Sequence, residues 1–405
     1  MAPIFQNKHI LLGVTGSIAA YKAAEIASRL TQEGALVDVI LTESAVKFVQ
    51  PITFQSVTGR KAYTEADLWG GEGHVTHIGL GKVGDLMVIA PASANTIAKL
   101  ANGIADNLLT VSALAARCPL LVAPAMDGGM FNHPATQHNV DILASRGVSI
   151  LGPGTGHLAS GLVGVGRLVD IPEIIGNIRW LLSRNNKLAG KHFLVSAGGS
   201  QEAIDPVRVI TNRSSGKQGF AIAQAALDAG ADVSLLAVNT SLPTPFGANR
   251  IDVCSAAELQ EKVFTFAAQS DVVIMAAAVA DFKPKNVASE KIKRGSDSLT
   301  IIMEPTEDIL KGLAARRKSG EKPHIVVGFA AESQNLLENA KKKLVAKKLD
   351  LLIANDISNS DSGFGVDMNR VSLLYPDGRI EPQELADKSV VGDLVIEKIT
   401  GMMNL

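Results

Sequence analysis

The chain has 405 residues, a length that exceeds one ordinary hydrophobic core and favours two domains. Hydrophobic residues make up 46% of it and charged residues 20%, which indicates a globular protein and excludes a disordered one. A formal net charge of -1 provides no basic field for nucleic acid, and two distant cysteines, Cys118 and Cys254, exclude a disulfide framework.

The N-terminal segment MAPIFQNKHILLGV has no basic stretch followed by a small-residue cleavage site, so we expect no secretion signal. No apolar run approaches the roughly 20 residues that a membrane-spanning helix needs. We therefore expect a cytoplasmic protein that binds neither nucleic acid nor membrane.

Short runs rich in Val, Ile and Leu alternate with alanine-rich segments of helical periodicity. The runs are HILLGV, LVDVIL, DLMVIA and PLLVAP, followed by HFLVSA, DVSLLAV, DVVIMAA, HIVVGF and DLLIAN. Such runs are typical of buried strands in parallel sheets. The alternation predicts an α/β fold of two Rossmann-like, doubly wound domains, the first of them flavodoxin-like.

A polar segment, SRNNK, interrupts this pattern near residues 180–191. We place the domain boundary there, with domains at residues 1–185 and 186–405. Each half opens with a strand followed by a small-residue turn, HILLGVTGS in the first and HFLVSAGGS in the second. One short likeness does not establish a repeat.

Polar and small residues follow the strands of the first half. They are expected at the carboxyl ends of the strands, which is where parallel sheets bind ligands. The glycine turn after the first strand offers backbone N–H groups for a phosphate, although it is also what a simple tight turn needs. Ser93 and Asn95 follow a later strand, where a helix is expected to start. A role as helix cap would explain these two residues equally well. The predicted cofactor-binding residues are Gly16, Ser17, Ile18, Thr42, Ser93 and Asn95.

The strings GSIAAYK, APASANTIAKLANGIADNLL and PAM followed by GGMF resemble the flavin-dependent cysteine decarboxylases. The resemblance implies that flavin mononucleotide (FMN) oxidises a C-terminal cysteine to a thioaldehyde, that carbon dioxide leaves, and that the reduced flavin returns a hydride. His77 matches the family's active-site histidine, with an acid/base or carboxylate-orienting role. A structural histidine is the alternative, and His74 is a nearby competitor.

Two positions depart from that family. Asp127 stands where the common motif has asparagine, and its carboxylate is expected to repel the substrate carboxylate. Ser160 stands in GTGHLASGLVGVGRL where many members have a cysteine, and a hydroxyl is a weaker acid than a thiol. This glycine-rich stretch is expected to be a lid, or else an ordinary surface loop. We expect decarboxylation to be retained; the alternative is an altered flavin-binding half beside an active ligase.

From Lys191 onward the chain resembles phosphopantothenate-cysteine ligase along nearly its whole length. The string SAGGSQEAIDPVRVITNRSSGKQG combines a glycine turn with arginine, serines and lysine before a helix, which favours a phosphate site over a capped loop. By resemblance, Asn212 contacts the activated acyl group and assists attack by cysteine. A turn asparagine is the alternative. A nicotinamide dehydrogenase is a rival interpretation, but both glycine turns lack GxGxxG.

The remaining ligase positions are nucleotide contacts by resemblance. Only Asp308 and Ile309 match the family's usual turn with Asn-Pro-Asp. Lys343 and Lys347 are spaced to share one helix face, where a solvated surface is the alternative. The full set is Asp281, Lys291, Thr306, Glu307, Asp308, Ile309, Phe329, Lys343 and Lys347.

The resemblance implies that CTP and Mg²⁺ activate phosphopantothenate as an acyl-cytidylate, which cysteine then attacks. The product is the substrate of the first half. Trimeric flavin domains and dimeric ligase domains are implied as well, whereas the metal ligands are not predicted.

Overall fold

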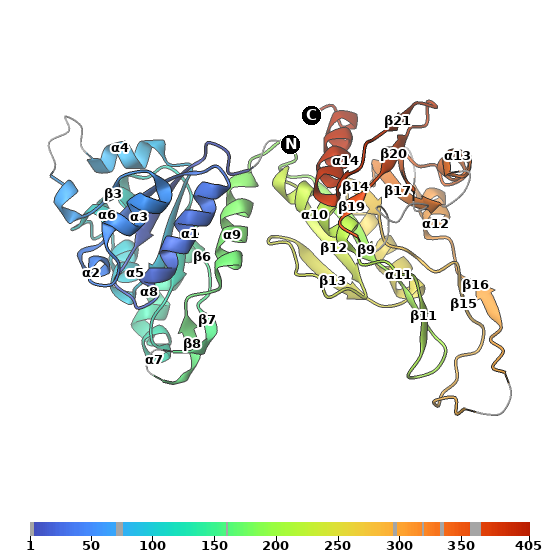
Figure 1. The fold of residues 1–405 in the computed structure, drawn as a ribbon, viewed down its shortest axis with the longest axis horizontal. Coiled ribbons are helices and arrows are strands. Elements are labelled where there is room, and N and C mark those ends of the chain that lie inside the picture. The colour runs from blue at the N-terminus through green and yellow to red at the C-terminus, as the bar shows by residue number, and fades with distance from the viewer. Residues whose placement is uncertain are drawn as a thin grey trace. The chain divides into compact units, whose positions relative to one another are not determined.

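The computed structural model describes residues 4–69, 76–158, 161–294, 298–317, 320–332, 336–356 and 366–405. The chain divides into two compact units, Ala2–Ser183 and Arg184–Leu405 (Figure 1). Each predicted strand run contains a strand, which confirms the α/β class. The predicted assignment of one activity to each half stays a prediction.

The described part of the first unit contains a six-stranded parallel sheet in the order β3-β2-β1-β4-β5-β6. Without the two-residue edge strand β3, this order is that of flavodoxin. The chain reverses direction across the sheet between β1 and β4. The strands are β1 (His9–Val14), β2 (Leu36–Leu41), β3 (Ala62–Tyr63), β4 (Leu86–Ala92), β5 (Leu120–Pro124) and β6 (Ser149–Ile150).

The longer helices of the first unit bury apolar residues on one side, as α1 shows. In α1, the buried residues Ala20, Ala23, Ile26, Ala27 and Leu30 recur at helical spacing. Burying a side chain as large as Ile26 or Leu30 stabilises the fold by about 1.5–3 kcal/mol. The helices are α1 (Ala20–Gln32), α2 (Glu43–Val46), α3 (Pro51–Thr58), α4 (Thr76–Val83), α5 (Ala94–Asn102), α6 (Leu108–Ala115), α7 (Gly128–Phe131), α8 (Pro134–Ser145) and α9 (Ile171–Ser183), with a 3₁₀ turn at Glu65–Asp67.

The glycine-rich stretch forms an antiparallel hairpin of β7 (Gly154–His157) and β8 (Val163–Arg167). The hairpin is attached to the end of β5 because Met126 N donates to Gly166 O at 2.9 Å. Gly166 has φ +140°, and a Cβ there would lie 2.2 Å from Met126 O. Only glycine therefore fits this contact. The described part of the stretch that we expected to be a lid or a surface loop thus contains two paired strands, and its role as a lid stays a prediction.

The described part of the second unit has an eight-stranded sheet in the order β13-β12-β9-β14-β17-β18-β20-β21. The first six strands of this order run parallel, and β20 and β21 are antiparallel to their neighbours. The direction of winding reverses between β9 and β14. The strands are β9 (His192–Gly198), β12 (Asp232–Val238), β13 (Asn249–Val253), β14 (Val272–Met275), β17 (Ile325–Glu332), β18 (Leu351–Asp356), β20 (Val371–Leu374) and β21 (Ile380–Pro382).

The described part of the second unit also contains three short antiparallel pairs. They are β10 (Gln201–Ala203) with β11 (Val209–Thr211), β15 (Phe282–Pro284) with β16 (Met303–Pro305), and β19 (Met368–Asn369) with β22 (Ala386–Asp387). Figure 1 shows β11 and the β15–β16 pair reaching away from the main sheet. The helices are α10 (Lys217–Asp228), α11 (Ala256–Ala267), α12 (Ile309–Arg316), α13 (Leu336–Ala346) and α14 (Lys388–Met402).

Close packing places α10 against both β9 and α14. A Cβ on Gly219 would lie 2.4 Å from Ala197 Cβ, and one on Gly392 would lie 2.9 Å from Ala221 O. Glycine at both positions therefore lets the start of α14 lie beside the start of α10.

Cys118 and Cys254 are free thiols, and burial raises the pKa of Cys118. Within the described ranges, no helix has the length and apolar character needed to cross a bilayer.

Candidate functional sites

A cavity of about 600 Å³ opens where β1, β4 and β5 end, at the reversal point of the first sheet. Ligands bind at such points because helix N-termini and strand ends converge there. Small side chains form much of its wall. The lining residues are Gly16, Ser17, Ile18, Ala19, Tyr21, Lys22, Phe48, Ser93, Ala94, Ala125, Met126, Asp127, Met130, His157, Leu158, Gly166, Arg167 and Leu168.

The glycine turn lies at this cavity, as the sequence predicted for Gly16, Ser17 and Ile18. A Cβ on Gly16 would lie 2.5 Å from Ser44 Cβ, so the turn approaches α2 too closely for a larger residue. The start of α1 has no side-chain cap and no acidic residue in its first turn. Backbone N–H groups at such a helix start attract an anion such as a phosphate.

Ser93 lies at the cavity and also caps a helix. Its Oγ accepts from Thr96 N at 3.3 Å, and its N–H donates to Thr15 Oγ1 at 2.9 Å. Thr42 caps α2 by accepting from Ala45 N at 3.2 Å. Thr42 and Asn95 are absent from the cavity lining within the described ranges. Thr42 thus caps a helix, and Ser93 both caps a helix and lines the cavity. The cofactor contacts predicted for Thr42, Ser93 and Asn95 stay predictions.

Asp127 faces the same cavity from the N-terminus of α7, where its Oδ1 accepts from Gly129 N at 2.9 Å. His157 and Arg167, on the β7–β8 hairpin, line the cavity as well, and the sequence analysis missed both. Arg167 pairs with Asp170 at 2.6 Å. The only sequence signal was the glycine-rich stretch, which does not reveal which polar side chains turn inward.

His77 lies in the first turn of α4 and is not among the described residues that line the cavity. Its Nδ1 is buried and, within the described part of the chain, has no hydrogen-bond partner. Such a buried nitrogen lacks the hydrogen bond that usually fixes a structural histidine. Ser160 and His74 lie outside the described residues. The roles of His77 and Ser160 stay predictions.

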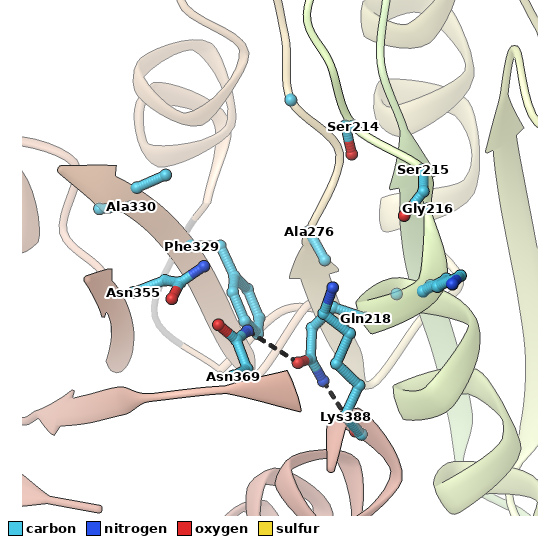
Figure 2. Close-up of a pocket in the computed structure, with 14 residues that line it drawn as sticks. Ser214, Ser215, Gly216, Gln218, Ala276, Phe329, Ala330, Asn355, Asn369 and Lys388 are labelled. Atoms are coloured by element: carbon cyan, nitrogen blue, oxygen red, sulfur yellow. Dashed lines mark hydrogen bonds between the residues drawn. The ribbon is translucent and has the colours of Figure 1, made fainter. Parts of the chain in front are cut away.

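In the second unit, a cavity of about 110 Å³ lies at the ends of β14, β17 and β18, beside the start of α10 (Figure 2). Phe329, a predicted nucleotide contact, is in its wall. The lining residues are Ser214, Ser215, Gly216, Lys217, Gln218, Gly219, Ala276, Ala278, Phe329, Ala330, Ala331, Asn355, Asn369 and Lys388.

The turn around Asn212 leads directly into this cavity. Asn212 Nδ2 donates to Ala278 O at 3.2 Å, and Ala278 lines the cavity. Gly216, the residue before α10, has φ +81°, and no side chain caps the helix. The amides of this first turn are therefore oriented for an anion, which agrees with the predicted phosphate site. Lys217 pairs with Asp367 at 2.6 Å.

Most of the other predicted nucleotide contacts form a second group around the start of α12. Thr306 N donates to Asp281 O at 2.9 Å, and Asp308 pairs with Lys347 at 3.2 Å. Glu307 accepts from Gln260 at 2.7 Å. Ile309 is 4% exposed and belongs to the hydrophobic core, so its side chain packs structurally. Lys343 lies one turn before Lys347, and Lys347 N donates to Lys343 O at 3.0 Å.

Asp205 and Arg208 hold the segment that carries Lys291. Asp205 Oδ2 accepts from Ile292 N at 3.1 Å, and Arg208 Nη2 donates to Ile292 O at 2.8 Å. The Arg208 guanidinium beside Asp205 holds the pKa of that carboxyl well below its usual range. Arg208 is thus engaged in positioning this segment.

Lys388, Gln218 and Asn369 form a polar network that the sequence analysis missed, and Asn355 lines the same cavity. Lys388 is 7% exposed, and burial, reinforced by the nearby charge of Lys217, lowers its pKa, although Asp367 acts in the opposite direction. These residues are distant in the sequence and match no motif that we recognised. Across the described residues, no group of three or more His, Cys, Asp or Glu side chains has the arrangement of a metal site.

Comparisons with known proteins cover both units. The family model described as "Flavoprotein" matches residues 5–183, and the one described as "DNA/pantothenate metabolism flavoprotein C-terminal domain" matches residues 188–403. The "Coenzyme A biosynthesis bifunctional protein CoaBC" of Bacillus subtilis (strain 168) is 42% identical over 402 residues, 98% of each chain. The chain belongs to this bifunctional coenzyme A biosynthesis family.

Further relatives of the coenzyme A biosynthesis family are equally similar to the chain. The CoaBC protein of Escherichia coli (strain K12) is 42% identical over 397 residues, 97% of each chain. A crystal structure of the C-terminal domain of a CoaBC protein is 36% identical and covers 54% of this chain and 99% of its own, with a TM-score of 0.47. The similarity to the relatives spans both cavities.

Proposed function

We propose that the second unit joins phosphopantothenate to cysteine at the expense of CTP, and that the first unit decarboxylates the resulting phosphopantothenoylcysteine with FMN. The observation that carries this proposal is 42% identity to bifunctional relatives along nearly the whole chain. A ligand-sized cavity at the sheet reversal point of the first unit, and a smaller one at the strand ends of the second, support it.

The first cavity fits FMN. Its volume of about 600 Å³ lies within the usual range for a cofactor site. The uncapped start of α1 and Ser17 suit the phosphate, while Ala94 and Ala125 leave room for a flat ring system. When bound, FMN supplies oxidation of the substrate thiol and return of the hydride.

The chain's own residues bind and orient the substrate in this proposal. Arg167 and His157 face the cavity from the hairpin, where a cationic side chain attracts the substrate carboxylate. Gly129 N donates a hydrogen bond to Asp127 Oδ1, and this bond holds the Asp127 carboxylate at the N-terminus of α7. His77, whose buried Nδ1 has no hydrogen-bond partner among the described residues, is the proposed acid/base or carboxylate-orienting group.

Ligation begins with a carboxylate that resists attack by an amine until one oxygen joins a leaving group. The carboxylate of phosphopantothenate displaces pyrophosphate from CTP, and the cysteine amine then displaces CMP from the acyl-cytidylate. Lys291, Lys343 and Lys347, with Mg²⁺, offset the negative charge that develops on the phosphates. Asn212, bonded to Ala278 O, orients the acyl group for attack.

Mass spectrometry of the purified full-length protein tests the two activities separately. Incubation with phosphopantothenate, cysteine, CTP and Mg²⁺ is expected to yield pyrophosphate, the amide and carbon dioxide. Replacing CTP with ATP measures the nucleotide preference. Failure to form pyrophosphate or the amide contradicts the ligase, whereas amide without carbon dioxide contradicts the decarboxylase and favours an altered flavin-binding domain.

We also propose trimers through the first unit, dimers through the second and a cytoplasmic location. The first unit exposes Tyr21, Ile52 and Val163 at 63%, 64% and 68%, and the second exposes Phe282 at 53%. Single exposed apolar side chains are common on protein surfaces, so the proposed contacts rest on the family resemblance and not on these residues. Light scattering of the full chain is expected to give an assembly larger than a dimer. A monomer would contradict both the proposed trimer contact of the first unit and the proposed dimer contact of the second.

A further inference from the structure

Thr15 is buried between two turns of the first unit at which flavin contacts are predicted. It is 1% exposed and stands between the end of β1 and the glycine turn that begins at Gly16. Its Oγ1 donates to Pro91 O at 2.8 Å and accepts from Ser93 N at 2.9 Å. A main-chain carbonyl only accepts and a main-chain N–H only donates, so the direction of both bonds is fixed. The hydroxyl therefore joins the glycine turn to the end of β4.

The side chain of Thr15 lies behind the wall of the first cavity. Gly16, Ser17 and Ser93 line this cavity of about 600 Å³, whereas Thr15 is not among the described residues of the lining. A ligand in the cavity consequently meets the neighbours of Thr15 and not its hydroxyl. A contribution of Thr15 to flavin binding therefore acts through the position of these neighbours.

The hydroxyl bonds continue the pairing of β1 and β4 beyond its last regular pair, which is Gly13 with Ile89. Past that pair, Thr15 N donates to Pro91 O at 3.3 Å, a long distance for such a bond. The two bonds of the hydroxyl are shorter, and one of them reaches Ser93, the N-cap of α5. The side chain therefore holds the start of α5 to the glycine turn more closely than the main chain alone.

The glycine turn is also in close contact with α2. A Cβ on Gly16 would lie 2.5 Å from Ser44 Cβ, so the turn packs directly against the first turn of that helix. Contacts with Ser44 and with the end of β4 leave the turn little room to shift. Backbone N–H groups bind an anion well where their direction is fixed, and a site that is ordered before the ligand arrives loses less entropy on binding.

We propose that Thr15 is a positioning residue for the flavin, because its hydroxyl holds the glycine turn, where the phosphate is expected, in a fixed place relative to Ser93. The inference rests on the proposed flavin function of the first unit. The flavin then meets both turns without either having to move. Thr15→Val keeps the shape of the side chain, but it leaves Ser93 N without its acceptor and Pro91 O without its closer donor. The two turns are then able to separate.

The rate of flavin release from the full-length holoenzyme tests this role. After dilution, the rise in fluorescence of the free flavin gives the dissociation rate. Thr15→Val is expected to release flavin at least about tenfold faster than the parent, since differences in affinity appear mainly in dissociation rates. Thr15→Ser keeps the hydroxyl and is expected to stay within about threefold of the parent.

Thr58→Val is the matched control, because Thr58 makes the same kinds of bond in the same unit. Thr58 is 8% exposed, and its Oγ1 donates to Phe54 O at 2.9 Å and accepts from Arg60 N at 3.1 Å. It is not among the described residues that line the cavity. The loss of two such bonds lowers Tm in both valine variants, whereas flavin release is expected to be faster in Thr15→Val alone.

Equal release from Thr15→Val and Thr58→Val overturns the assignment. Release from Thr15→Ser as fast as from Thr15→Val overturns it too, since packing and not the hydroxyl would then be responsible. Thr15→Ala, which removes the hydroxyl and leaves more room, replaces Thr15→Val if the valine variant does not fold, and the same order of rates is expected. A parent protein that neither holds flavin nor takes up added FMN contradicts the flavin function itself, which separates that failure from a failure of the role of Thr15.

Discussion

Lys347 Nζ lies 3.2 Å from Asp308 Oδ2, so an ion pair joins the residue after the end of α13 to the residue before the start of α12. Asp308 also caps α12 by accepting from Lys311 N at 3.1 Å. The two side chains are 23% and 32% exposed, and an ion pair of that kind contributes at most about 1 kcal/mol to folding. The pair therefore serves to position Lys347 more than to stabilise the fold.

The first prediction follows from that small contribution. Lys347→Met is expected to raise the KM for CTP about tenfold, because one charge-assisted contact to phosphate is lost, while Tm stays nearly constant. Steady-state kinetics and thermal unfolding measure the two effects. Lys342→Met removes a comparable surface pair with Glu338 and is the control. Equal CTP kinetics in the two variants would show that Lys347 does not contact the nucleotide.

Asp205 links acid stability to the position of Lys291. Its folded-state pKa is depressed, so its contribution to stability is present above the unfolded value and is lost as pH falls toward the folded one. We expect parent and Asp205→Asn to differ in Tm by a constant amount above about pH 5 and by less below about pH 4. Thermal unfolding of both proteins over a pH range that extends below about pH 4 and above about pH 5 measures the difference in Tm.

Asp205→Asn is also expected to raise the KM for CTP several-fold. The amide loses the ionic bond to Arg208, and with it the contacts that both residues make to Ile292 beside Lys291. Asp377→Asn, a substitution in an exposed turn of β20 and β21, is the control. A pH-independent difference in Tm would contradict the ionic role of Asp205.

Local pattern predicted the strands and several turns that line a cavity, because each depends on residues close in sequence. An apolar run between helical segments indicates a strand that is buried in a sheet. Gly16, Ser17 and Ser93 follow such strands at the reversal point of the first sheet. Resemblance supplied Asp308 and Lys347, which the structure joins.

Networks between distant segments were beyond this reasoning. Gln218, Asn369 and Lys388 meet only because α14 packs on α10, and no periodicity in either segment encodes that contact. Thr42 shows the converse limit: a hydroxyl after a strand serves as a cap or as a ligand, and its neighbours in sequence do not distinguish the two.

Asp127 provides a prediction for the flavin site. Asp127→Asn is expected to lower the KM for phosphopantothenoylcysteine several-fold, because the amide oxygen still accepts from Gly129 N while the negative charge facing the substrate carboxylate is removed. Carbon dioxide release measures the effect. Asp141→Asn, at an exposed position of α8, controls for net charge. A raised KM would mean that the carboxylate binds the substrate favourably.

Gly166 tests whether the β7–β8 hairpin holds the flavin site together. Its φ of +140° and the 2.2 Å separation that a Cβ would have from Met126 O leave no room for alanine. Gly166→Ala is expected to cost about 2 kcal/mol or more and to release bound flavin, because the hairpin must move from the end of β5. Gly164→Ala, two residues earlier where a Cβ meets nothing within 4 Å, is the control. Visible absorbance after gel filtration reports the retained flavin, and equal retention in the two variants would mean that the hairpin contact is dispensable for binding.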